Sequence, residues 1–107
     1  MDMEELLETI GGTQAARDYM QGIVEGTEQA RNADRALRGA VHYIRGAGIR
    51  DGMALAQPEL YAQAAYSIAA DWSETLGNAQ EGARTQVPIG ARSIIVQMRY
   101  ARENREA

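Results

Sequence analysis

The sequence predicts an all-α protein, a small bundle of four to five helices with one extended loop before the last helix. Three observations predict this class. Apolar residues recur three and four positions apart along most of the chain, alanine is abundant, and glycines separate the apolar stretches. The 107 residues suit one domain, spanning 1–107.

The first third of the chain predicts two helices. In MDMEELLETIGG, acidic residues occupy the first turn, where the helix dipole favours them, and Gly11 and Gly12 end the helix. Thr13 can cap a second helix that reaches about Arg31. Its apolar stripe is expected to run through Tyr19, Met20, Ile23 and Val24.

A third helix is predicted over residues 34–46, with Asp34 as its N-cap. Gly46 and Gly48 are expected to end this helix. The loop that follows has room for one short turn around Met53 to Ala56. The stripe expected to face the core is Leu37, Ala40, Val41 and Ile44.

Pro58 begins the strongest helical pattern of the chain, residues 58–77. Proline suits the first turn of a helix, because its missing N–H would find no partner there in any case. The stripe predicted to form the centre of the core is Tyr61, Ala65, Ile68, Trp72 and Leu76. Trp72 is interpreted as a core residue, since a stacking platform for nucleic acid usually comes with a basic groove and this segment is acidic.

The stretch ARTQVPIG interrupts the helical pattern. Thr85–Ile89 is predicted to be extended, because Pro88 disfavours helix at the residue before it, and Gly90 allows a turn. A last helix then starts at Ala91, and residues 103–107 are expected to fray. Its predicted core residues are Ile94, Ile95 and Met98.

The composition excludes several classes of protein. The formal charge is −4, which disfavours a sequence-reading DNA binder, although an acidic protein can surround DNA without gripping it. All 11 basic residues are arginine, and no cysteine is present to form a disulfide, a nucleophile or a metal site. The acidic N-terminus does not resemble a signal peptide, and no apolar run reaches the length of a membrane span. We expect a soluble, intracellular protein.

No catalytic pattern stands out. His42 is the only histidine and has no carboxylate three or four positions away, so a surface or structural role is favoured. Asp71 and Glu74 are three apart on the strongest helix, but no Glu-x-x-His motif completes a metal or acid–base site. The glycines of GAGIRDG match no phosphate-binding motif. The sequence predicts no enzyme, no cofactor and no metal site.

The segment from Gln57 to Arg102 resembles a known family. A proline-started, alanine-rich helix ends in the cluster ADWSE, residues 70–74, and a polar loop then leads to VPIG, residues 87–90. A final helix with Arg99 near its end follows. This order resembles the head–tail connector, or adaptor, proteins of long-tailed double-stranded DNA bacteriophages and prophages.

The resemblance implies a structural role. Such proteins form a ring of identical subunits beneath the portal, in the neck of the virion, after assembly in the cytoplasm of the bacterial host. The ring joins the portal protein to the next head-completion or tail-joining protein, and DNA passes through it without sequence-specific binding. The resemblance implies no catalytic activity, no cofactor and no membrane.

Two segments are the candidate contact regions. Residues 81–90 are assigned to contacts between subunits or with a partner, and residues 99–107 to docking on the portal or a neighbouring subunit. The individual candidates are Glu81, Arg84, Gln86, Val87, Pro88, Gly90, Arg99 and Arg102. The alternative hypothesis is a small helical regulatory or protein-binding module that acts through a partner protein.

Overall fold

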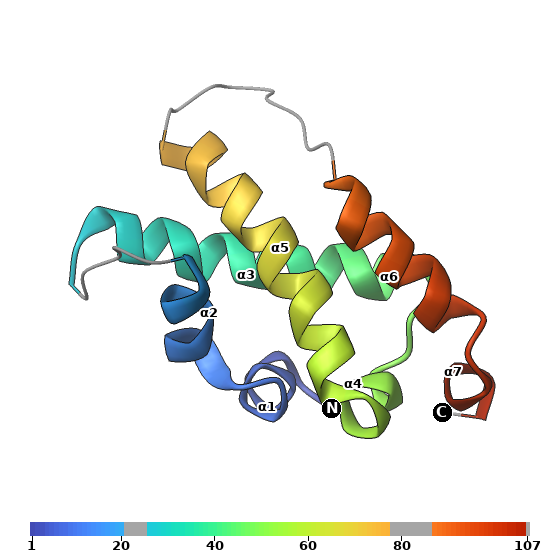
Figure 1. The fold of residues 1–107 in the computed structure, drawn as a ribbon. Helices are drawn as coiled ribbons and strands as arrows, with labels where there is room; N and C mark the ends of the chain where they lie inside the picture. Colours follow the sequence, from blue (N-terminus) through green and yellow to red (C-terminus); the bar gives the residue numbers. More distant parts are fainter. Residues whose placement is uncertain (21–25, 78–86, 107) are drawn as a thin grey trace.

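The computed structural model describes residues 1–20, 26–77 and 87–106, with the backbone alone for 74–77 and 106. These residues form helices and contain no strand, so the predicted all-α class is confirmed (Figure 1). The helices are α1 (Met3–Thr9), α2 (Gly12–Met20), α3 (Glu28–Gly46), α4 (Gly52–Ala56), α5 (Pro58–Gly77), α6 (Ile89–Arg99) and α7 (Arg102–Glu106). The shortest of these, α4 and α7, have five residues each, and α4 matches the short turn predicted around Met53.

The turn between α1 and α2 depends on two glycines. Gly11 has φ 116° and Gly12 has φ 81°, both in the left-handed region that glycine adopts without a steric penalty. A Cβ atom at Gly11 would also lie 2.7 Å from the Tyr66 hydroxyl. The prediction that this glycine pair ends the first helix is confirmed. The second helix begins at Gly12, however, so Thr13 lies inside its first turn and the predicted Thr13 cap is wrong.

The predicted boundary between the second and third helices is also wrong. Gly26 has φ 84°, which no α-helix accommodates, and Thr27 then caps α3 by accepting a hydrogen bond from the Ala30 N–H at 3.2 Å. The third helix therefore starts at Glu28, and Asp34 lies inside it rather than at its cap. Ile23 and Val24 lie outside the described residues. The end of α3 is as predicted, at Gly46, with Gly48 at φ 94°.

The core forms where α3 crosses α5. These two helices make the most extensive contact between elements, while α2 and α6 pack on opposite sides of α5 (Figure 1). Fully buried alanines on both helices, such as Ala40 and Ala65, leave room for a close approach. The largest fully buried side chains are Leu6, Leu37, Val41, Ile44, Ile49, Met53, Tyr61, Ile68 and Met98.

The C-terminal region differs from the single helix predicted after Ala91. The helix α6 starts two residues earlier and ends at Arg99, and its C-cap residue Tyr100 has φ −94° and ψ 2°. The extended geometry predicted for 85–89 can be compared with the structure only from Val87 onward, because residues 85 and 86 lie outside the described residues. Val87 and Pro88 are not helical, whereas Ile89 is already the first residue of α6. Gly90, predicted to form a turn, lies in the first turn of α6.

The tail is anchored where fraying was predicted. Asn104 on α7 is 6% exposed. Its Oδ1 accepts from the Arg50 N–H at 2.8 Å, and its Nδ2 donates to the carbonyls of Gly48, at 3.1 Å, and Arg99, at 3.3 Å. These bonds tie α7 to the connection between α3 and α4. A buried amide with three partners holds α7 in place.

Candidate interaction surface

The segment predicted to contact a partner is only partly described. Glu81, Arg84 and Gln86 lie outside the described residues. Val87 is 5% exposed and belongs to the core, so its side chain is not available for a partner. Pro88 is half-buried and Gly90 is exposed.

The entry to α6 is held by a hydrogen bond. Pro88 is the N-cap residue and has φ −53° and ψ 144°, an extended backbone geometry directly before the first helical residue, Ile89. The Arg92 Nε donates to the Val87 carbonyl at 3.1 Å. The apolar Val87 side chain and this polar contact together fix where the helix begins.

The predicted docking residues Arg99 and Arg102 are both exposed. The Arg99 Nε donates to the Ala47 carbonyl at 2.9 Å and so links the end of α6 to the end of α3. Arg99 therefore has a structural contact within the chain as well as an accessible surface. Arg102 begins α7, two residues before the buried Asn104.

The helix α6 has two apolar faces. Its inner face packs on α5 through Ala91, Ile95 and Met98, which are buried. Its outer face exposes Ile89, Val96 and Tyr100, with exposed fractions of 78%, 50% and 72%. These three residues, named here the outer row, are seven and four positions apart and so share one side of the helix and its C-cap.

Sequence reasoning missed the outer row. Ile89 was placed in the extended segment, and Val96 and Tyr100 were assigned to no face. The signal was present in the 89–96–100 spacing, but the stronger stripe through Ile95 and Met98 accounted for the helix by itself.

The predicted core residues are mostly confirmed as core. Tyr61, Ala65, Ile68, Ile95 and Met98 are buried. Trp72 and Ile94 are partly buried and pack against the core, and the Leu76 side chain lies outside the described part.

Trp72 fills the space beside a glycine. Its ring lies within ordinary contact distance of a Cβ atom placed at Gly39, and it meets the Tyr43 ring edge-on at 6.0 Å between centroids. The interpretation of Trp72 as a packing residue agrees with this position.

The other candidates from the sequence do not come together. His42 is exposed on α3, Asp71 is exposed on α5, and the Glu74 side chain is not described. No group of three potential metal ligands occurs among the described residues. A shallow hollow at the corner between α4 and α5 is lined by Ala56, Gln57, Pro58, Glu59, Leu60 and Gln63.

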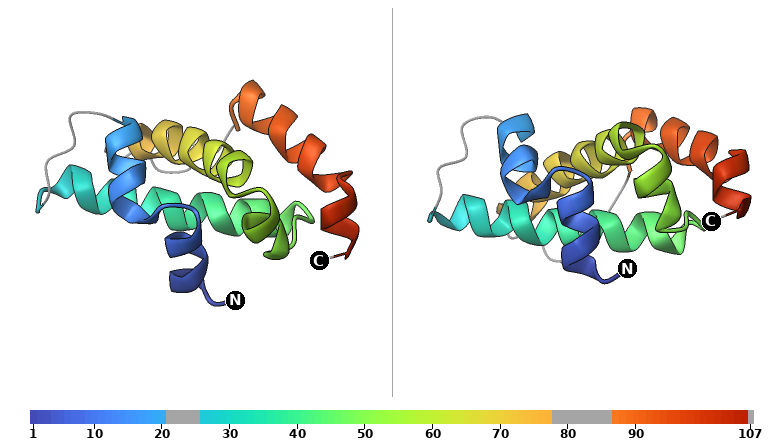
Figure 2. Two further views of the ribbon diagram at one scale, coloured as in Figure 1. Left: turned by 60° about the horizontal axis from the view of Figure 1, so that its bottom comes forward. Right: turned by 90° about the horizontal axis from the view of Figure 1, so that it is seen from below.

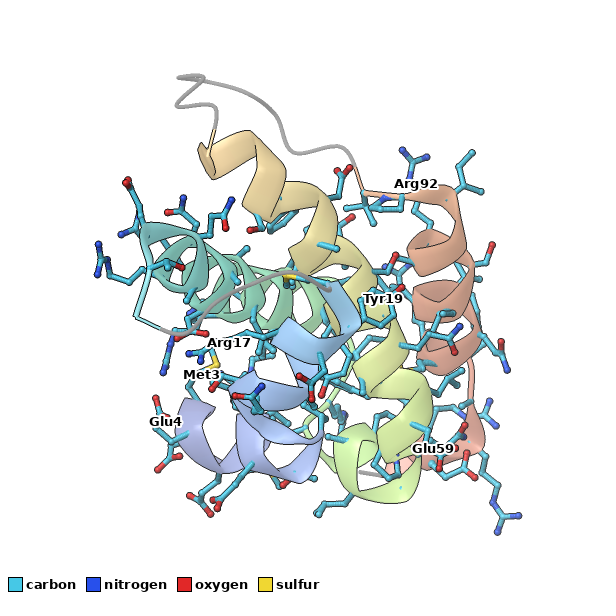
Figure 3. The ribbon with its side chains drawn as sticks, turned by 60° about the vertical axis from the view of Figure 1, so that its left-hand side comes forward. Met3, Glu4, Arg17, Tyr19, Glu59 and Arg92 are labelled. Atoms are coloured by element: carbon cyan, nitrogen blue, oxygen red, sulfur yellow. The ribbon has the colours of Figure 1, made fainter. Side chains whose placement is uncertain are left out.

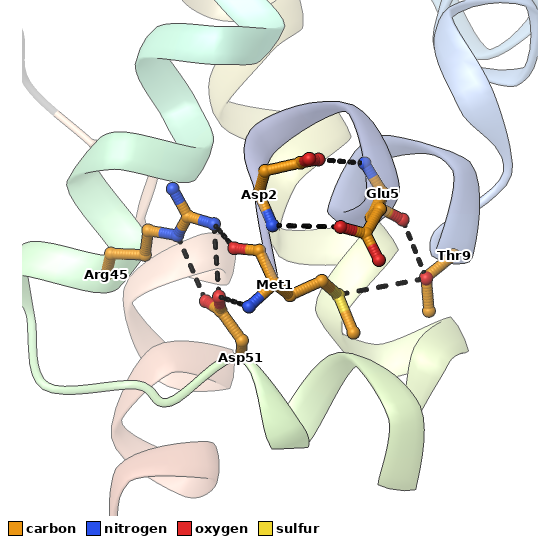
Figure 4. A network of polar contacts seen from close by, with 6 residues as sticks. All are labelled: Met1, Asp2, Glu5, Thr9, Arg45 and Asp51. Carbon is orange, nitrogen blue, oxygen red and sulfur yellow. Dashed lines mark hydrogen bonds and ion pairs between the residues drawn. The ribbon is translucent and has the colours of Figure 1, made fainter.

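A polar network joins the N-terminal segment to the α3–α4 connection (Figure 4). Asp51 accepts two hydrogen bonds from Arg45, at 3.0 and 3.1 Å, and Arg45 also donates to the Met1 carbonyl at 3.1 Å. The hydrogen bond to Asp51 is the main reason that the pKa of Arg45 is raised.

Two further ion pairs hold the N-terminal helices onto α3. Arg17 on α2 lies 2.9 Å from Asp34, and Arg38 on α3 pairs with Glu4 on α1. The Asp34 that was predicted to cap a helix therefore joins two helices instead.

No family model, curated protein or solved structure matches this chain. Among the described helices, none combines the length and the apolar character needed to cross a membrane.

Proposed function

We propose that this chain is a subunit of a ring-shaped head–tail connector of a bacteriophage or prophage. In this role it joins the portal to a head-completion or tail-joining protein in the virion neck, and DNA passes through the ring. The observation that carries the proposal is the outer row on α6, because it lies within the segment whose order of features resembles that family.

The outer row is suited to contact with another protein. Its three apolar side chains lie on α6 and on the C-cap residue of α6. The opposite face of α6 is packed into the core, so the backbone that carries the outer row has a fixed position. Exposed apolar groups of this kind mark interaction surfaces, and tyrosine is frequent where binding energy concentrates. A structural subunit needs such surfaces and needs no catalytic group, metal or cofactor.

Binding to a portal tests the proposal. The purified chain is mixed with the portal protein from the same genome, and complexes are examined by electron microscopy and sedimentation. We expect a ring of the chain on one end of the portal. Tyr100→Glu is expected to weaken binding at least about tenfold, since it places a charge in the outer row.

Gln97→Glu is the matched control, because it introduces the same charge at an exposed position of α6 outside the outer row. Normal binding by this variant alongside loss in Tyr100→Glu supports the proposal. Failure of the unaltered chain to bind portal, head-completion and tail-joining proteins from its own genome contradicts it.

A further inference from the structure

The outer face of α6 carries a complete helical stripe, of which the outer row is the apolar part. Ser93 lies four residues after Ile89 and three before Val96, and Tyr100 follows four residues later. This spacing is typical of a helix that packs on another helix. Ser93 is exposed and small, so it leaves room between its larger neighbours. Figure 2 shows α6 at the edge of the molecule, with α5 on its inner side.

Two arginines lie beside this stripe, and their guanidinium groups are held in place. The Arg92 Nε donates to the Val87 carbonyl before the start of α6, and the Arg99 Nε donates to the Ala47 carbonyl beside its end. Within the described part of the chain, neither guanidinium group has a further hydrogen bond or ion pair. The N–H groups on the terminal nitrogens therefore remain available. Figure 3 shows Arg92 at the beginning of α6, at the edge of the molecule.

The charge of α6 is opposite to that of the whole chain. The helix contains Arg92 and Arg99 and no acidic residue, whereas the chain carries a formal charge of −4. Glu103 on α7 is the nearest acidic residue along the chain, and its carboxylate accepts a hydrogen bond from Gln57 at 3.4 Å. The outer face of α6 thus combines apolar contact area with two positioned positive charges.

We propose that the outer face of α6 binds an acidic amphipathic helix of a partner protein. The inference rests on the proposed function, for which it names the chemistry of the surface that the subunit contacts on its neighbour. Apolar side chains of the partner helix pack on Ile89, Val96 and Tyr100. Carboxylates of the partner accept paired N–H donors from Arg92 and Arg99. Because both guanidinium groups are already positioned, less side-chain entropy is lost on binding.

The charge and the apolar stripe together disfavour other occupants. A nucleic acid duplex matches the arginines, but it places phosphates against Ile89 and Val96, and the negative charge of the whole chain repels it. A second copy offers the glutamates of α1, but the apolar side chains Leu6 and Leu7 of that helix are buried. A partner helix with both carboxylates and an exposed apolar stripe matches the whole surface.

Binding of three designed peptides tests the inference. The first peptide has a leucine stripe flanked by glutamates, the second has lysines in place of the glutamates, and the third has serines in place of the leucines. A hydrocarbon staple on the opposite face holds each peptide helical, and fluorescence anisotropy measures its binding to the full chain. We expect the first peptide to bind at least about tenfold more tightly than either of the others. Its advantage over the lysine peptide should decrease at high salt.

Equal affinity for the glutamate and lysine peptides overturns the inference, and so does the absence of binding by the glutamate peptide. A DNA duplex that displaces the glutamate peptide at a lower concentration than unlabelled peptide does would assign the outer face to nucleic acid. Self-association that Val96→Ser abolishes would assign it to a second copy. Either of these results also overturns the inference.

Two variants test the two halves of the surface separately. Arg92→Gln should weaken binding of the glutamate peptide by about three- to tenfold at low salt and by less at high salt. Val96→Ser should weaken it at both salt concentrations, because it removes apolar contact area. Arg35→Gln is the matched control for charge, since Arg35 is exposed on α3. Circular dichroism checks that each variant is folded, and equal affinities of Arg92→Gln and Arg35→Gln would contradict the inference.

The two proposals can fail separately. Preference for the glutamate peptide without binding to the portal, head-completion or tail-joining protein retains the site on α6 and removes the connector role. Portal binding by a chain that does not distinguish the three peptides retains the connector role and removes the acidic partner helix.

Discussion

Two buried tyrosines on α5, Tyr61 and Tyr66, differ in the hydrogen bonding of their hydroxyl groups. The Tyr66 hydroxyl donates a hydrogen bond to the Ile10 carbonyl, at the end of α1. The Tyr61 hydroxyl is buried and has no hydrogen-bond partner in the described part of the chain. A buried hydroxyl without a partner loses its hydration and gains nothing in return, so Tyr61 contributes through its ring alone.

Replacing Tyr61 by Phe should therefore preserve stability. We expect the free energy of unfolding of Tyr61→Phe to be unchanged or up to about 1 kcal/mol higher at neutral pH. Tyr66→Phe is the comparison variant, and it should lower the free energy of unfolding by about 1 kcal/mol or more because it leaves the Ile10 carbonyl unpaired. Urea denaturation measures both, and a larger loss in Tyr61→Phe than in Tyr66→Phe would contradict this account.

The same tyrosine makes the protein sensitive to alkaline pH. Burial, with the nearby Asp51 carboxylate, raises the pKa of Tyr61 to about 12 from its ordinary value of 10. Because the folded state holds the proton more tightly, the stabilisation is complete below pH 10 and is lost as the pH rises toward 12. Burial also raises the pKa of Tyr66.

In the Tyr61→Phe variant, the decrease in unfolding free energy between pH 10 and 12 should be smaller than in the unaltered chain. The measurement is urea denaturation at a series of alkaline pH values. An identical pH dependence in the two proteins would show that Tyr61 ionises in the folded state as easily as in the unfolded state.

At the scale of elements, the short C-terminal helix depends on one side chain. Asn104 is the only residue of α7 in the buried class among its described side chains, and its three hydrogen bonds reach the α3–α4 connection and the end of α6. A five-residue helix is not stable by itself in water, since helix nucleation is unfavourable. The position of α7 therefore depends on this amide.

Replacing Asn104 by Ala should release α7. We expect the Arg50 amide to lose its protection against hydrogen exchange and the free energy of unfolding to decrease by about 1–3 kcal/mol. Arg105→Ala, an exposed change on the same helix, is the control and should have little effect. Retained protection at Arg50 in Asn104→Ala would contradict the anchoring role.

The sequence predicted the end of a helix correctly where a proline or glycine marks that end and no other nearby residue could mark it equally well. Pro58 marks the start of α5, and Gly11 with Gly12 marks the end of α1, as the structure confirms. Thr27 was missed as a cap because Asp34 is an equally good cap residue by type. The choice depended on Gly26, whose positive φ ends any helix before Thr27, and on Arg17, which engages Asp34.

At the scale of the whole molecule, α5 is the element around which the others pack. It contacts α2, α3, α4 and α6, and its side chains are buried on several sides. The sequence predicts one stripe with Ala62 and Ala69 beside it, although Ala64 and Tyr66 are buried as well. A helix enclosed on several sides has little tolerance for added volume.

A larger residue at Ala65 should disturb the whole fold. Ala65→Leu is expected to lower the free energy of unfolding by about 1–3 kcal/mol through overpacking. Gln63→Leu is the matched control, because it places the same side chain on α5 at an exposed position and should have little effect. Denaturation followed by the fluorescence of the single tryptophan measures both, and an equal response of the two variants would contradict the central role of α5.

The sequence by itself determined the fold class, the strongest helix and the buried positions of Tyr61, Ala65 and Ile68 on it, because helical spacing, proline and glycine act over a few residues. The tertiary structure alone decided that Asn104 is buried, that Val87 faces the core and that Ile89, Val96 and Tyr100 remain outside. These features join residues up to 56 positions apart, and only packing brings such residues together.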